Sequence, residues 1–176
     1  MSSQALPRTL SVRKAITAGS CLSGRLELAS LARVAGAVLG AEQPFGVELV
    51  FAETDGGKWT VHARVDGLVQ LECQRCLQPV TVPLSADSLL TIVAHDAEAR
   101  ARLRDVEPLL LQGDELDVFG LVEDEILLAL PIVALHDSGD CRAQTAQGAV
   151  QDKGEDAGHG EQESSERRKN PFAVLQ

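Results

Sequence analysis

Aromatic residues, basic residues and long apolar runs are all scarce in this 176-residue sequence. Aromatics make up 3% of the chain, with no tyrosine and one tryptophan, so a platform on which nucleic-acid bases stack is not expected. The 26 acidic residues outnumber the 16 basic ones and give a formal net charge of −10. A protein that grips phosphate backbones over a broad surface needs a net basic face, so this composition favours a basic partner instead.

Membrane-spanning and secretory signals are also missing. No stretch of 18 or more apolar residues is present, so no membrane partner is predicted. The basic residues near the N-terminus are followed by a segment broken by Thr, Gly and Ser rather than by the apolar region of a signal peptide. The sequence therefore predicts a cytoplasmic protein, in which cysteines serve as free thiols or metal ligands rather than disulfides. The four cysteines are Cys21, Cys73, Cys76 and Cys141.

The clearest periodic pattern lies between residues 59 and 73. Every odd position there is apolar or small: Trp59, Val61, Ala63, Val65, Gly67, Val69, Leu71 and Cys73. A period of two predicts a β-strand with one buried face, so the sulfur of Cys73 is expected to face the core. The run is much longer than the about five or six residues of an average strand, and Asp66-Gly67 is therefore expected to mark a bulge or bend.

Strand and helix patterns alternate around this segment. Further strands are predicted over residues 24–28, 45–52, 80–84, 88–94 and 108–111, a hairpin turn at 55–57, and short helices at 30–39 and 97–104. The strongest helix is expected at 118–130, where Asp117 caps its start and Pro131 stops it. The pattern predicts an α+β fold, with an antiparallel β-sheet packed by a C-terminal helix and short helices, followed by a disordered acidic tail.

Composition divides the chain into four parts. Residues 1–20 are mixed and weakly basic and are expected as a flexible N-terminal arm. Residues 21–136 carry the predicted elements and are expected as a single α+β domain. Residues 137–166 contain eight acids and two bases, which predicts a disordered acidic linker. Residues 167–176 form a basic and apolar motif that would either dock on the protein's own core or bind a partner.

Cys73 and Cys76 lie at a Cys-x-x-Cys spacing where the alternating strand ends. This spacing lets two thiolates converge from a tight turn and is one half of a zinc site. The first-ranked completion adds His136 and Cys141, which follow the strongest helix and give a closed Cys3His set of the structural type. Zinc is accordingly the one cofactor that the sequence suggests.

Three alternatives remain open for the cysteine pair. Other residues could complete a metal site, namely Cys21 and His95. The pair could also be two reduced structural thiols without a metal. A redox pair needs a helix N-terminus or cationic neighbours to lower a thiol pKa, and only Arg75 offers such help here.

An acidic cluster, Glu123-Asp-Glu125, lies within the strongest predicted helix. Acids in the first helical turn suit the helix dipole, but these lie further in and need solvent or a partner. Glu123, Asp124 and Glu125 are therefore candidate contacts for a basic partner, together with Pro171 and Phe172 in the final motif. No nucleophile elbow, phosphate-binding loop, dinucleotide fingerprint or metalloprotease motif is present, so an enzyme is not predicted.

Three stretches together resemble a known family. They are Leu71-Glu-Cys-Gln-Arg-Cys-Leu77, Leu121-Val-Glu-Asp-Glu-Ile-Leu-Leu-Ala-Leu-Pro131 with His136 and Cys141 behind it, and Asn170-Pro-Phe-Ala-Val-Leu175. In this order and spacing they are similar to the YceD-type large ribosomal RNA subunit accumulation proteins of bacteria. The resemblance covers roughly residues 59–176. It implies a cytoplasmic, non-enzymatic factor needed for synthesis, processing or stability of 23S ribosomal RNA. Some relatives carry a further cysteine pair near the C-terminus, where this chain has only Cys141.

Three hypotheses about partners follow. The charge of −10 favours contact with the large-subunit precursor through a basic ribosomal protein or assembly factor. Direct RNA contact is the alternative, through the basic residues between Arg8 and Arg33 and between Arg64 and Arg75. The third hypothesis concerns function and not a partner: the Cys-x-x-Cys pair would make the chain a thiol redox or zinc-binding protein.

Overall fold

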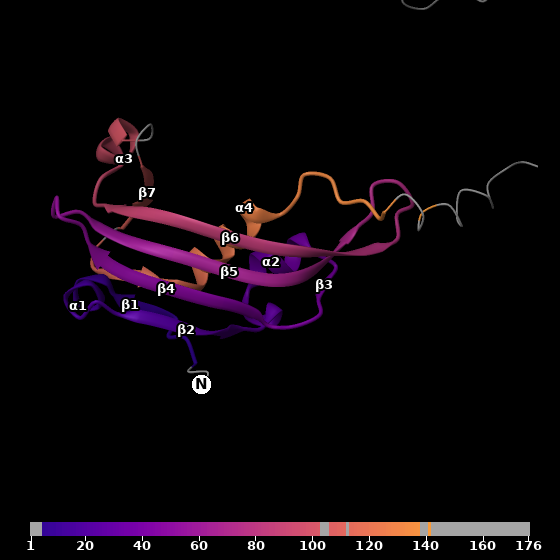
Figure 1. Ribbon diagram of the computed structural model, residues 1–176, viewed down its shortest axis with the longest axis horizontal. Helices are drawn as coiled ribbons and strands as arrows, with labels where there is room; N and C mark the ends of the chain where they lie inside the picture. The colour runs from indigo at the N-terminus through magenta and orange to yellow at the C-terminus, as the bar shows by residue number, and fades with distance from the viewer. Residues whose placement is uncertain (1–4, 103–105, 112, 138–140, 142–176) are drawn as a thin grey trace, which may run out of the picture.

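The computed structural model describes residues 5–102, 106–111, 113–137 and 141. Its elements in chain order are β1 (Thr9–Ser11), α1 (Val12–Thr17), β2 (Cys21–Leu26), a 3-10 turn (Leu28–Ser30), α2 (Ala32–Ala37), β3 (Gly40–Ala41), β4 (Phe45–Glu53), β5 (Trp59–Glu72), β6 (Pro79–Val93), α3 (Asp96–Arg102), β7 (Glu107–Leu110), β8 (Glu115–Asp117) and α4 (Val118–Ala129). A six-stranded sheet in the order β2-β4-β5-β6-β7, with β3 paired to β5, runs along the long axis of the molecule (Figure 1). The predicted α+β class is confirmed, and only the β6–β7 pairing is parallel among the described strands.

The hairpin of β5 and β6 is the longest feature of the sheet. Its residues pair in antiparallel register from Thr60 with Thr91 to Glu72 with Pro79, without a skipped residue. The predicted bulge at Asp66-Gly67 is therefore wrong, because these two residues pair in turn with Ser85 and Leu84. The strands predicted at 80–84 and 88–94 are likewise one continuous strand, β6.

A glycine is required at position 67 by packing and not by backbone conformation. A Cβ built on this glycine would lie 2.5 Å from the Cδ1 atom of Phe45. Phe45 is fully buried, so its ring has little room to move away. Because Gly67 has no side chain, the aromatic ring of Phe45 can lie directly against the backbone of β5.

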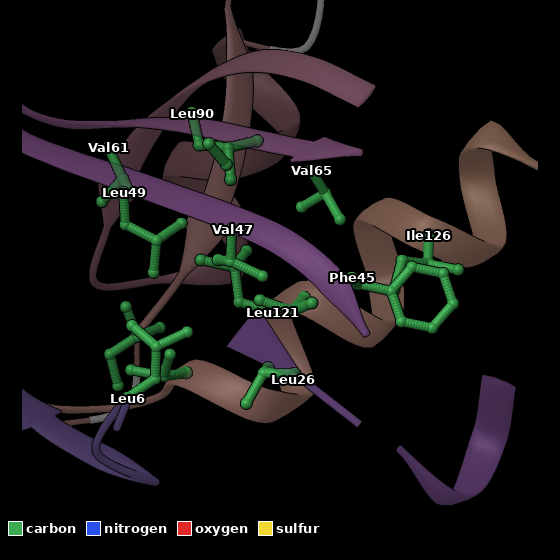
Figure 2. Close-up of a cluster of buried hydrophobic side chains, with 14 of the residues drawn as sticks. Leu6, Leu26, Phe45, Val47, Leu49, Val61, Val65, Leu90, Leu121 and Ile126 are labelled. Atoms are coloured by element: carbon green, nitrogen blue, oxygen red, sulfur yellow. The ribbon is translucent and has the colours of Figure 1, made fainter. Parts of the chain in front are cut away.

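Helix α4 covers one face of the sheet, and the core lies between them (Figure 2). The sheet contributes alternate residues of β4 and β5, and α4 contributes one stripe of side chains. The labelled members of this cluster are Leu6, Leu26, Phe45, Val47, Leu49, Val61, Val65, Leu90, Leu121 and Ile126. Asp117 caps α4 as predicted, since its side chain accepts hydrogen bonds from the backbone N–H groups of Phe119 and Gly120.

Residues 5–20 are part of the fold, which corrects the prediction of a flexible arm over residues 1–20. Strand β1 pairs with β8, and α1 follows it directly. The buried side chains of this segment are Leu6, Val12, Ala15 and Ile16. The last three follow the i, i+3, i+4 spacing of an amphipathic helix, a signal that the charge-based interpretation missed. The expected acidic linker and final motif lie outside the described residues, except Asp137 and Cys141.

The packing at Gly67 predicts that Gly67→Ala lowers the free energy of unfolding by about 1–3 kcal/mol, the usual cost of overpacking a close contact. Gly36→Ala is the matched control, because a Cβ there meets nothing within 4 Å and alanine favours the helix α2. Urea denaturation of the two variants measures both effects. Equal stability of Gly67→Ala and the parent protein would contradict this account of the close contact.

Candidate functional site

The Cys-x-x-Cys pair lies in the turn that joins β5 to β6. Two backbone hydrogen bonds close this turn, from the Cys73 N–H to the Gln78 carbonyl and from the Leu77 N–H to the Cys73 carbonyl, both 2.9 Å. Leu77 adopts a left-handed conformation (φ 59°), a strained state for a leucine that a tight turn can impose. Cys73 is fully buried and so lies away from solvent as predicted, although in a small cluster of its own rather than in the main core.

The chain that leaves α4 completes the site. It passes Pro131 and runs along the sheet towards the far end of the β5–β6 hairpin (Figure 1). The N–H of Gln74 donates to the carbonyl of Ala134 at 2.9 Å, which ties this segment to the turn. Cys73, Val80, Ala134 and Cys141 form a small buried cluster, separate from the main core.

The four predicted metal ligands converge at this place. The ligand atoms of Cys73, Cys76, His136 and Cys141 all lie within 4.8 Å of one another. The Sγ atom of Cys141 lies 3.7 Å from each of the other two sulfurs and 3.6 Å from the Nδ1 atom of His136. A zinc ion with Zn–S bonds of about 2.3 Å and tetrahedral geometry places its ligand atoms about 3.8 Å apart. The donor set and its spacing therefore fit a zinc ion.

Hydrogen bonds around the site orient its ligands. The Nε2 atom of His136 lies 3.0 Å from the Pro79 carbonyl oxygen, so Nε2–H donates there and Nδ1 keeps its lone pair for a metal. The backbone N–H of His136 donates to the Cys73 sulfur at 3.5 Å. Burial acts to raise the pKa of the Cys73 thiol, but N–H donors from His136, Cys76 and Arg75 outweigh it and lower the pKa to about 5. Burial, with the two neighbouring thiols, raises the pKa of Cys141 to about 11.

The alternative ligands do not join this cluster. Cys21 is exposed on β2, where its sulfur lies 3.9 Å from a carboxylate oxygen of Glu48. His95 is exposed just before α3. Neither residue belongs to a metal-ligand group within the part of the chain that the structure describes.

The predicted acidic partner contacts on α4 are largely engaged within the fold. Glu125 is 4% exposed and accepts a hydrogen bond of 2.6 Å from the Ser88 hydroxyl, which corrects its interpretation as a partner-facing acid. Arg33 of α2 binds the other two acids, with Nε 3.1 Å from Glu123 and Nη2 2.7 Å from Asp124. These contacts attach α2 to α4. Long-range pairing of this kind leaves no signal in the local sequence.

Three of the basic residues that could meet RNA, Arg13, Arg33 and Arg64, already contact other side chains of the fold. Arg64 lies on the face of the sheet opposite α4, 3.2 Å from Glu48 and 3.3 Å from Asp87. The guanidinium of Arg13 lies 5.6 Å from the centre of the Trp59 ring. Arg33 and Arg64 thus lie in small mixed-charge groups, whereas Arg13 lies against an aromatic ring, and these three residues do not form a continuous basic surface.

Two further sequence predictions have a simple outcome. Pro171 and Phe172 lie outside the described residues, so their predicted contact with a partner stays a prediction. Among the described residues, no helix is long and apolar enough to cross a membrane.

Comparison with known proteins supports the resemblance noted in the sequence. The profile of the family described as large ribosomal RNA subunit accumulation protein YceD matches residues 61–176. A protein of that name from Haemophilus influenzae is 33% identical over 108 residues, which are 61% of this chain and 58% of the relative. The match thus spans less than two thirds of the relative's length. No solved structure matches the chain significantly.

The burial of Glu125 predicts a pH-dependent penalty. Burial raises the pKa of this carboxyl group in the folded protein, so the unfolded chain ionises first as pH rises. Folding stability therefore falls from the ordinary pKa of a glutamic acid upward, until the folded carboxyl also ionises. Glu125→Gln keeps an acceptor for Ser88 and removes the charge, so it should raise the free energy of unfolding at pH 7 and not at pH 3.

Urea denaturation at the two pH values measures this difference. Glu123→Gln is the control, because it removes an ion pair with Arg33 instead of a buried charge and should bring no gain at pH 7. A Glu125→Gln protein that is less stable than its parent at pH 7 would contradict the prediction.

Proposed function

Because the chain belongs to the YceD family of large ribosomal RNA subunit accumulation proteins, we propose that it acts in accumulation of 23S ribosomal RNA as a cytoplasmic, non-enzymatic binding protein. One observation carries this proposal: the family match over residues 61–176 includes the β5–β6 turn, α4 and the segment that returns to the turn. The three parts that meet in space are thus the parts shared with the family. The role covers synthesis, processing or stability of that RNA.

We further propose that the site built from Cys73, Cys76, His136 and Cys141 holds zinc. The sulfur and nitrogen atoms have the spacing of a tetrahedral set, and the His136 ring is oriented through its other nitrogen. Four protein ligands leave no open position for water or substrate, so the ion has a structural role. It would fasten the segment after α4 to the hairpin turn.

The partner we propose is a basic ribosomal protein or assembly factor on the large-subunit precursor. The support is the net charge of −10, and the acids of α4 supply little of the contact because they are buried or bound to Arg33. The stretch at 137–166 contributes eight further acids to that charge. Direct RNA contact has less support, since Arg33 and Arg64 are each bound by two carboxylates.

The zinc proposal predicts about one zinc ion per purified chain in elemental analysis, the stoichiometry of a closed four-ligand site. Cys141→Ser should lower this content strongly and lower the melting temperature, because loss of a ligand releases the ion and its contribution to folding. Cys21→Ser is the matched control, since this exposed cysteine lies outside the cluster and its loss should leave the zinc content unchanged. Metal-free parent protein of normal stability would refute the zinc site.

The functional proposal predicts that the chain sediments with large-subunit precursor particles in a sucrose gradient. Cells that lack it should contain less 23S relative to 16S ribosomal RNA, and expression of the parent chain should restore the ratio. Crosslinking should recover a basic protein of the particle. Recovery of 23S RNA alone, or an unchanged RNA ratio in the deleted strain, would count against the corresponding part of the proposal.

A further inference from the structure

The surface between α4 and strands β6 and β7 contains an apolar groove. Two adjoining hollows of about 290 and 230 Å³ share Glu107, Glu125 and Leu128 in their walls. The apolar walls come from both layers: Leu90, Pro108, Leu109, Leu121, Leu127 and Ala129. Leu128 is 75% exposed, a high value for a leucine on a helix that otherwise packs on a sheet. The groove is thus an apolar surface that lacks a covering group among the described residues.

The groove is acidic as well as apolar. Three acids line it: Glu107, which is exposed, Asp124, whose side chain is 58% exposed, and Glu125, which is buried against Ser88. Glu107 and Asp124 are thus the acids that an occupant can reach, and no lysine or arginine side chain is among the lining residues. Arg33 binds Asp124 from the side of α2. An occupant that carries both basic and apolar side chains would therefore complement this surface better than a purely apolar one.

The chain itself contains one segment with this composition. Residues 167–175, Arg-Arg-Lys-Asn-Pro-Phe-Ala-Val-Leu, place three bases directly before an apolar run. This basic–apolar segment lies outside the described residues, whereas the groove lies within them. Its bases complement the acids Glu107 and Asp124, and its apolar run complements the exposed side chain of Leu128.

The connection between the two has a suitable length. Cys141 lies beside the turn at Val80, and the groove borders β6 from Ser85 to Leu90. At about 3.3 Å per residue, the Ser85 end of the groove lies roughly 17 Å along the strand from Val80, and the Leu90 end roughly 33 Å. A chain of the length of residues 142–166 has a root-mean-square span of roughly 25–30 Å. A tether whose span matches the separation gives the highest effective concentration of its end at the site.

From the groove, its charge and the tether length, we propose that residues 167–175 dock in cis into the groove formed by α4, β6 and β7. The apolar side chains Phe172, Val174 and Leu175 cover Leu128, and the basic triplet meets the carboxylates of Glu107 and Asp124. The groove then acts as a receptor for the protein's own motif. A basic–apolar segment of a partner could replace it only by competition. This inference does not depend on the proposed function.

Hydrogen exchange of the full chain tests the proposal. The double variant Phe172→Asp/Leu175→Asp should exchange the amides of β7 and of the second half of α4 at least about tenfold faster than the parent. Leu128→Asp should have the same effect, and its combination with the double variant should add nothing further, because both changes remove one contact. Leu89→Asp is the matched control, since Leu89 is 62% exposed and lies on the other face of β6.

Peptide binding separates docking in cis from docking in trans. In fluorescence anisotropy, a labelled peptide of residues 167–176 should bind the full-length Phe172→Asp/Leu175→Asp protein. It should bind the parent protein about tenfold more weakly, because the groove of the parent is occupied by its own segment. Binding should weaken as salt rises. Circular dichroism confirms that each variant is folded. Failure of the peptide to bind the double variant, or equal affinity for both proteins, overturns the proposal. Protection that rises with protein concentration also overturns it, in favour of a second copy as the donor.

Discussion

The uninterrupted pairing of β5 with β6 is the constraint on which the rest of the structure depends. Side chains in a paired strand alternate between its two faces, and a slip of one residue would exchange those faces. The buried positions Val61, Val65 and Val69 fix that phase against α4. Cys73 lies in the same phase, so the register of the core also determines the direction of the first thiol of the candidate metal site.

The second half of the site depends on where α4 ends. The helix stops at Ala129, and Pro131 prevents its continuation. An extended chain advances about 3.3 Å per residue, against about 1.5 Å in a helix. The few residues between Pro131 and His136 can therefore cover a longer distance to the hairpin turn than a continued helix could. A helix stop and a strand register, set far apart in the sequence, together produce the convergence of four ligands.

Local patterns are enough to predict the α+β class, the α4 helix with its Asp117 cap, and the Cys73/Cys76 pair of the cluster. His136 and Cys141 join the prediction only because they follow a helix that is expected to pack on the same sheet. The alternation from residue 59 to 73 and the Cys-x-x-Cys spacing are signals that the chain carries within a few residues. The failures have a different origin. Gly67 was interpreted from its own conformational freedom, whereas its reason is the ring of Phe45, which lies far from it in sequence.

The acidic cluster of α4 failed for the same reason. Glu123 and Asp124 bind Arg33, about ninety residues away, and Glu125 is buried against Ser88 on β6. Composition gives the number of charges in a segment but does not reveal which of them are already paired in the fold. The chain still has more acidic than basic residues, but only some of its carboxylates are available to a partner.

Residues 142–166 join the candidate metal site to the groove, and the energetic effect of this connection can be estimated. With Cys141 fixed at the turn, docking of the basic–apolar segment closes a loop over residues 142–166; without that attachment the loop would start near the end of α4. The cost of closure grows only with the logarithm of length, so the shorter loop favours docking by only about 0.3 kcal/mol. This is much less than the energy of a typical buried apolar contact. The groove's own contacts therefore determine whether the segment docks, and attachment at Cys141 changes the cost of docking only slightly.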